Sequence, residues 1–207
     1  RTLGGIDMNE IVKSERTIKL DDLFTQWRRK VEQHNFIEDG IVDEYIWITT
    51  KLKVLFLLKD ANDEGGTKDW DLRGFLRQGA FDGTQGYTAT WGLIARYAYG
   101  IQKGFCTWIA TEFKNSGVDF SIHTQRQDYL KSIAVMNIKK SGGAGTNKWD
   151  ELEDAVRSSR SFILDEIGII APDVIVAGGT GWLIPKIFTE PGSLEEVTLS
   201  TGVMCQK

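Results

Sequence analysis

Three short apolar runs divide the chain and predict the strands of a buried sheet. They lie at Lys53–Leu58, Ile133–Met136 and Asp173–Ala177, and a polar or glycine-containing loop follows each of them. A continuous apolar run bounded by turn residues is typical of a strand covered on both faces. Strand–helix–strand spacing favours parallel pairing through right-handed crossovers. The pattern therefore predicts an α/β fold, a three-layer αβα sandwich with a mostly parallel central sheet.

The segments between these runs show apolar residues at helical spacing. An amphipathic helix is expected from a cap at Asp21 or Asp22 to about Gln33, because Leu23, Phe24, Trp27 and Val31 recur at that spacing. Further helices are predicted over Trp70–Leu76, from Thr90 to about Tyr99, from Thr146 or Asn147 to Gly168, and over Trp182–Phe188. Tyr45–Thr49 fits either a helix or an extended segment.

The length of 207 residues is sufficient for one domain with a full core, which we assign to residues 8–207. Residues 1–7 precede Met8, and we interpret them as vector-derived. The apolar runs are too short to span a bilayer, so no membrane association is expected. Cys106 and Cys205 have no metal-ligand spacing and do not indicate a disulfide scaffold. We therefore expect a cytoplasmic protein without a metal or a cofactor.

A formal net charge of −4 argues against binding of nucleic acid by the whole surface. A local basic face remains compatible with this charge. Lys139 and Lys140, close to Lys148, are candidate phosphate ligands. For the two other basic clusters, Arg28–Lys30 and Arg157 with Arg160, we expect solvated helix faces.

The loops after the three predicted strands carry the candidate chemistry, because ligands of open α/β sheets bind outside the carboxyl ends of the strands. Asp60 is able to orient water or to stabilise a cationic transition state, or else it forms a turn. Asn137 offers a donor and an acceptor to the edge of a base, with turn formation again the alternative. Glycine backbone amides at two further places either bind phosphate or form ordinary turns: Gly142, Gly143, Gly178 and Gly179.

The order of these segments resembles the uracil-DNA glycosylase superfamily. The resemblance rests on Leu57–Asn62, Val135–Lys140 and Ile170–Gly179, and it extends over about residues 53–188. In that superfamily a Gly-Gln-Asp-Pro-Tyr motif follows the first central strand, and Asp60 matches its Asp, which activates or orients the attacking water. Asn137 matches the Asn that reads the flipped base in some branches.

The resemblance implies that a damaged base is extruded from DNA into a pocket and that its N-glycosidic bond is then hydrolysed. Asp60 would be the catalytic group. Asn137 and Asn62 would contact the base, and the ring of Trp70 or Phe75 would stack on it. DNA is thus the implied partner, and no cofactor is implied.

Three features depart from the family pattern. Lys59, Ala61 and Asn62 replace the Gln, Pro and Tyr of the first motif. Both histidines precede the second motif, so the His-containing loop that assists the departing base has no counterpart. The cysteines do not form the ligand set of the iron–sulfur branches. Two alternatives therefore stay open: a non-catalytic nucleic-acid or nucleotide-binding module, and an unrelated α/β protein that binds a phosphorylated ligand.

Overall fold

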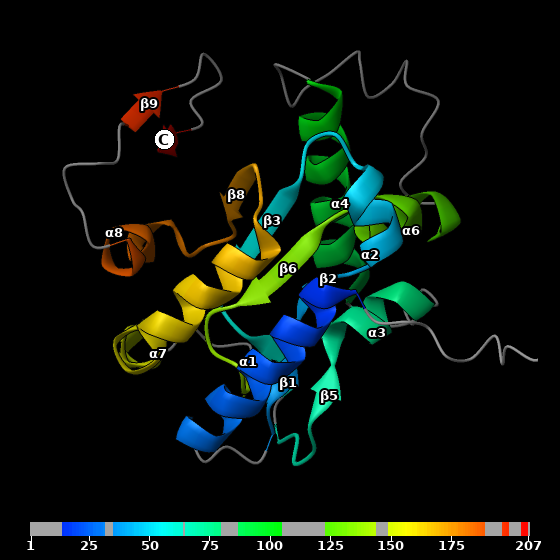
Figure 1. Ribbon diagram of the computed structural model, residues 1–207. Coiled ribbons are helices and arrows are strands. Elements are labelled where there is room, and N and C mark those ends of the chain that lie inside the picture. The colour runs from blue at the N-terminus through cyan, green and yellow to red at the C-terminus, as the bar shows by residue number, and fades with distance from the viewer. Residues whose placement is uncertain are drawn as a thin grey trace, which may run out of the picture.

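Four strands form the central sheet of the structure, a computed structural model (Figure 1). The described residues are 14–31, 35–63, 65–79, 87–104, 123–143, 149–188, 196–198 and 204–206. In spatial order the strands are β2 (Gly40–Ile41), β6 (Ala134–Asn137), β3 (Val54–Leu58) and β8 (Val174–Ala177). β6 and β8 flank β3 in parallel, and β2 is antiparallel to β6. The predicted parallel pairing of the three apolar runs is confirmed, whereas the sequence pattern does not indicate β2.

The side chains of β3 alternate between two hydrophobic cores, one on each face of the sheet. Leu55 and Leu57 belong to one core, and Val54 and Phe56 belong to the other. All four side chains are buried. Because neighbouring residues of a strand point to opposite faces, a strand packed on both sides needs an apolar residue at every position. This requirement explains the continuous apolar run.

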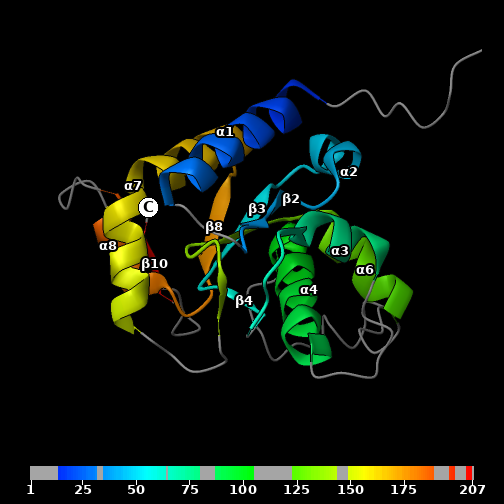
Figure 2. The ribbon, with the colours of Figure 1, turned by 90° about the horizontal axis from the view of Figure 1, so that it is seen from below.

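Helices α1 (Glu15–Val31) and α7 (Trp149–Ile170) cover one face of the sheet, as Figure 2 shows. The predicted start of α1 at Asp21 or Asp22 is wrong, because the helix begins six residues before Asp21. The Ser14 hydroxyl accepts a hydrogen bond from the Thr17 backbone N–H at 3.1 Å and thereby caps the helix. The expected end near Gln33 lies outside the described residues.

Helices α3 (Leu72–Gln78), α4 (Tyr87–Lys103) and α6 (His123–Lys131) cover the opposite face. α3 begins after Trp70, because the Asp71 carboxylate accepts the Arg73 backbone N–H at 2.8 Å. Trp70 therefore belongs to β5 (Trp70–Asp71), which pairs in parallel with β1 (Ile37–Glu38). α4 begins before Thr90, its predicted cap. The pattern misses α6, since only two of its nine residues are apolar.

Several short elements complete the described structure. α2 (Glu44–Thr49) is a helix because the Asp43 carboxylate accepts the Ile46 backbone N–H at 3.2 Å, which resolves the ambiguous segment. The 3-10 turn η1 (Gly181–Leu183) and α8 (Ile184–Ile187) replace the single helix predicted after β8. Two small ladders pair β4 (Ala61–Asn62) with β7 (Gly142–Gly143) and β9 (Glu196–Thr198) with β10 (Met204–Gln206). No described helix has both the length and the apolarity to cross a membrane.

Helix α7 continues past Gly168, its predicted end, and stops at Ile170 shortly before Pro172. The predicted start at Thr146 or Asn147 lies outside the described residues. A Cβ added at Gly168 would meet no atom within 4 Å. We expect Gly168→Ala to raise the free energy of unfolding by about 0.5–1 kcal/mol, measured by urea denaturation, because alanine restricts the unfolded chain more than glycine does.

Gly79 is the matched control, because the same change there should have the opposite sign. It is the C-cap of α3 with a φ of 69°, and an added Cβ would overlap the Gln127 side chain. Gly79→Ala should lower the free energy of unfolding by about 1 kcal/mol, since alanine is strained in the left-handed region. A loss of stability in Gly168→Ala would contradict the open surroundings of that position.

Candidate functional site

The loops after β3, β6 and β8 meet at one edge of the sheet, which we call the carboxyl edge. The final residues of β3 and β6 are in register, since Leu58 pairs with Asn137. After β8, the Gly178 backbone N–H donates to the Leu57 carbonyl at 2.9 Å. Asp60 lies two residues after the end of β3. The three loops therefore lie at the same edge of the sheet.

The connections that leave β3 and β6 run to opposite faces of the sheet. β3 leads to the layer of α3, α4 and α6, whereas β6 leads to α7 (Figure 2). Neighbouring strands with such connections mark the position at which open α/β sheets bind ligands. In this chain the β4·β7 ladder joins the two loops, with Ala61 opposite Gly142 and Asn62 opposite Gly143. The two halves of the candidate site are therefore held together by main-chain pairing.

Asp60 is half-buried, and its carboxylate lies against Gly143. A Cβ at Gly143 would overlap this carboxylate, so the close approach requires a glycine. Burial raises the pKa of Asp60, Lys139 and Lys59 oppose the rise, and Glu151 adds to it. A partly desolvated carboxylate near two cations is suited to polarise a water molecule or to stabilise positive charge on a sugar.

Asn137 ends β6 and carries a buried amide group. The residue is 1% exposed, and its Nδ2 has no hydrogen-bond partner among the described residues. Alternation along β6 puts this side chain on the same face as Val135, the face covered by α3, α4 and α6. An unsatisfied buried donor costs about 1–3 kcal/mol. Such a group calls for a specific explanation, and binding of a ligand is one.

Trp70 contacts Asp63, the residue that follows β4, and Asn62 is an exposed residue of the ladder itself. The Trp70 indole N–H donates to the Asp63 carboxylate at 3.0 Å, and the ring meets Phe75 edge-to-face at 5.8 Å. Trp70 and Phe75 both pack on the face of the sheet that carries the Asn137 side chain. The aromatic residues predicted to stack on a base therefore lie on the same face as the predicted base-reading amide.

Lys139 and Lys140 have different surroundings. The Lys139 ammonium is partly exposed and pairs with the Glu151 carboxylate at 2.6 Å. The Lys140 ammonium is buried, where it pairs with Asp39 and, at 2.7 Å, with Glu166. Asp39, Lys140 and Glu166 are called the buried triad below. Because the Lys140 ammonium is buried and already paired with Asp39, its expected role as a phosphate ligand is not compatible with this position, and only Lys139 is retained.

The buried triad is connected directly to Asn137. The Asp39 carboxylate accepts the Asn137 backbone N–H at 2.6 Å, so it fixes the end of β6. Burial raises the pKa of Glu166 well above its ordinary value, Lys140 opposes the rise, and Asp39 adds to it. The Glu166 Oε2 atom lies 2.7 Å from the Lys140 Nζ atom. This combination favours the protonated form of Glu166.

The four glycines predicted to bind phosphate serve packing and turns in the structure. Gly178 and Gly179 donate their backbone N–H groups to the carbonyls of Leu57 and Ala177 at 2.9 and 3.1 Å. Gly142 and Gly143 belong to β7, where a Cβ would overlap Asp63 and Asp60 respectively. The contacts of Gly178 and Gly179 are those of an ordinary turn, the alternative stated from the sequence, whereas the close packing of Gly142 and Gly143 in a strand ladder was not predicted.

A pair of exposed tryptophans at the carboxyl edge has no counterpart among the predicted residues. Trp149 opens α7 and Trp182 lies in η1, and their rings meet edge-to-face at 5.6 Å. The Lys59 ammonium lies 5.6 Å from the centre of the Trp149 ring, and that of Lys186 lies 5.2 Å from the Trp182 ring. We call these four residues the tryptophan rim. The sequence gives no signal for it, because tryptophans 33 positions apart are more often part of a core.

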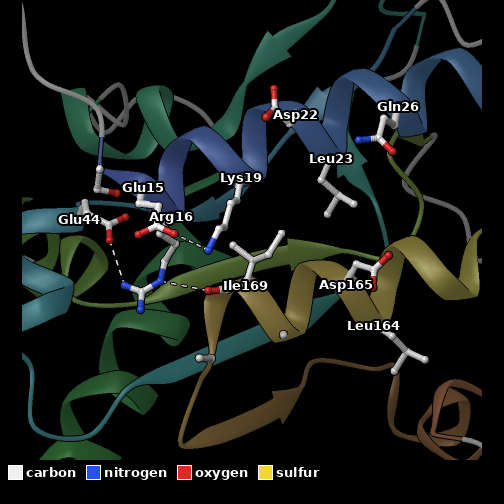
Figure 3. Close-up of a pocket in the computed structure, with 13 residues that line it drawn as sticks. Glu15, Arg16, Lys19, Asp22, Leu23, Gln26, Glu44, Leu164, Asp165 and Ile169 are labelled. Atoms are coloured by element: carbon white, nitrogen blue, oxygen red, sulfur yellow. Dashed lines mark hydrogen bonds and ion pairs between the residues drawn. The ribbon is translucent and has the colours of Figure 1, made fainter.

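A separate groove of roughly 860 Å³ lies between α1 and α7 (Figure 3). It is lined by charged groups that pair with one another: Arg16 contacts Glu44 at 3.0 Å and the Ile169 carbonyl at 3.0 Å, and Lys19 contacts Glu15 at 2.6 Å. The groove is near the amino-terminal end of β8 and includes none of the predicted site residues. The groove is therefore separate from the carboxyl edge, and we do not assign the candidate chemistry to it.

Comparisons with known proteins do not connect this arrangement to a family. No protein-family model, curated protein or solved structure matches the chain. Within the described residues, no group of three or more His, Cys, Asp or Glu side chains is arranged to hold a metal ion. The chemistry of the carboxyl edge must therefore be inferred from its own residues.

Proposed function

We propose that the chain is a uracil-DNA glycosylase-like protein that holds a base extruded from DNA at the carboxyl edge and hydrolyses its N-glycosidic bond. The unpartnered amide of Asn137 is the observation on which the proposal mainly rests. Asp60 supports it, because it follows the neighbouring parallel strand, as the family resemblance requires. In this proposal the two helix layers and the sheet between them correspond to the αβα sandwich of that superfamily. The protein is also proposed to be cytoplasmic.

Each residue has a defined part in the proposed reaction. The Asn137 Nδ2 group donates to a carbonyl oxygen of the extruded base, which satisfies the buried donor. The bond between the base nitrogen and the sugar C1′ breaks, and its electron pair leaves with the base. The Asp60 carboxylate stabilises the positive charge on the sugar and accepts a proton from the water that attacks C1′. Trp70 or Phe75 supplies the stacking surface.

A nucleic-acid-binding module without catalysis is the second candidate. The contact between the Asp60 carboxylate and Gly143 favours it, because that contact occupies one side of the proposed catalytic group. The first motif favours it as well, because Lys59, Ala61 and Asn62 replace the Gln, Pro and Tyr of the family pattern. In this second candidate, Asn137 recognises a base and Lys139 contacts phosphate, while no bond is broken.

Oligonucleotides that contain uracil or hypoxanthine test the proposal directly. We expect the wild-type protein to produce alkali-labile abasic sites, and Asp60→Asn to lower the rate by about 10²-fold or more, which is typical of a lost general base. Because the pKa of Asp60 is raised, activity should fall as the pH decreases through that pKa. Asp154→Asn is the control, since Asp154 is an exposed residue of α7 that pairs with Arg157.

Absence of base release by a folded wild-type protein would rule out the glycosylase. Binding of DNA that weakens with salt and with Lys139→Gln would then support the binding module. Equal rates for Asp60→Asn and Asp154→Asn would remove Asp60 from the reaction even if base release is observed.

A further inference from the structure

We propose that the tryptophan rim is a stacking platform for single-stranded DNA, on which nucleotides that flank the extruded base are held. The inference deepens the proposed function and rests on it for the choice of DNA as the partner. It adds two site residues, Trp149 and Trp182, and it specifies the strand form of the substrate.

The first argument is the exposure of two large aromatic side chains in one place. Trp149 is 45% exposed and Trp182 is 37% exposed, although the two residues come from segments separated by the whole of α7 and β8. Their edge-to-face contact leaves indole surface open to a further ring. Nucleic-acid bases stack on such surfaces, and the interaction tolerates any base because every base has a π-face.

The second argument concerns charge, and it favours a single strand over a duplex. The Lys59 and Lys186 ammonium groups lie over the Trp149 and Trp182 rings, within reach of the phosphates of a strand stacked on the exposed indole surface. Carboxylates balance part of this charge, because Lys186 pairs with Glu153 and the nearby Lys139 pairs with Glu151. The rim thus relies more on stacking than on phosphate contacts. Only a single strand presents free base faces for stacking, whereas a duplex presents mainly its phosphates.

The third argument is continuity with the proposed catalytic group. Lys59 precedes Asp60 in the chain, and both Lys59 and Glu151 influence the pKa of Asp60. Glu151 lies in the first turn of α7, the turn that Trp149 opens. A strand stacked on the rim would therefore bring a neighbouring nucleotide to Asp60, at the edge of the sheet where β6 ends with Asn137.

Equilibrium binding of labelled oligonucleotides to the Asp60→Asn protein tests the rim without consumption of the substrate. The probes are an oligothymidylate of about 10 nucleotides, within the usual site size, a strand of equal length built from abasic residues, and a hairpin duplex. We expect the oligothymidylate to bind more tightly than either of the others. Trp149→Ala and Trp182→Ala should each weaken its binding by about 5- to 100-fold, and Trp→Phe changes should retain most of the affinity.

Two further variants separate stacking from charge and from general surface effects. Lys59→Gln combined with Lys186→Gln should reduce the slope of log affinity against log salt by about 1.4, as expected for two phosphate contacts of a single strand. Tyr45→Ala is the control, because Tyr45 is 78% exposed on α2, away from the carboxyl edge. It should leave binding unchanged.

The rim inference is overturned if the abasic strand binds as tightly as oligothymidylate, or if the tryptophan variants, shown to be folded by circular dichroism, bind like Tyr45→Ala. It is also overturned if the duplex binds more tightly. Failure of the proposed function has a different signature, because rim-dependent binding would then persist while the wild-type protein releases no base.

Discussion

Lys140→Met is expected to lower the free energy of unfolding by about 3–5 kcal/mol, the usual effect of removing one partner from a buried ion pair. Lys140 is the only cation of the buried triad, and all three side chains are at most 1% exposed. Without it, the carboxyls of Asp39 and Glu166 stay buried and lose their neutralising charge. Methionine fills much of the vacated volume, so the loss reports mainly on charge. Urea denaturation curves compared by midpoint and slope provide the measurement.

Two variants bracket this result. Lys19→Met removes an ammonium that is 59% exposed and pairs with Glu15, so it should change stability by less than about 1 kcal/mol. A loss in Lys140→Met no larger than this would contradict the role of the triad. Glu166→Gln removes a titrating group and leaves Lys140 paired with Asp39.

The raised pKa of Glu166 fixes the sign of its pH effect. The folded state holds the proton more tightly than the unfolded state, whose ordinary value is 4.5. The contribution of Glu166 to stability is therefore fully present below about that pH and is lost as the pH rises through the raised pKa. Relative to the wild type, Glu166→Gln should gain stability as the pH increases. A constant difference between the two proteins would contradict this assignment.

Asn137→Leu is expected to lower base release by about 10²-fold or more, because a site built to hydrogen-bond its substrate discriminates strongly when that bond is lost. It should do so without loss of folding stability. The Asn137 Nδ2 donor has no partner in the described part of the chain, so an apolar side chain of similar size removes an unsatisfied group. Steady-state rates on uracil-containing strands and urea denaturation give the two readouts.

Thr180→Val is the contrasting change at the same edge. Thr180 is fully buried like Asn137, but its hydroxyl donates to the Leu57 carbonyl at 2.7 Å. Loss of this bond should lower the free energy of unfolding by about 1 kcal/mol. If Asn137→Leu proves as destabilising as Thr180→Val, or leaves base release unchanged, Asn137 is a structural residue and not the base-reading group.

The sequence predicts the central strands of this fold well and the ends of its helices poorly. The strands are predictable because burial on both faces demands continuous apolar runs, as in Val54–Leu58. Helix starts depend on single side-chain caps, and several candidates compete. Ser14 caps α1 although Asp21 and Asp22 look equally suitable from the sequence. α6 packs against α3 and α4, and these long-range contacts cannot be predicted from the local sequence pattern of the helix.

The sequence predicts where the candidate site residues lie in the fold, but it does not predict which of their side chains are buried or paired. The placement of Asp60 and Asn137 at the carboxyl edge follows from the sequence, because each lies within two residues of the end of a predicted strand. Lys139 and Lys140 are neighbours in the sequence, yet one reaches the surface and the other is neutralised inside the core. Which of two adjacent lysines is buried depends on Glu166, a residue from a distant helix. The tryptophan rim likewise exists only after α7 and β8 are folded.

The β4·β7 ladder also limits how the chain can vary in length. Each partner in the ladder is reached from its parent strand through a short, fixed number of residues: two separate Leu58 from Ala61, and four separate Asn137 from Gly142. An insertion or deletion in either interval would shift the pairing and turn alternate side chains to the other side. Divergent copies of this gene should therefore conserve both spacings.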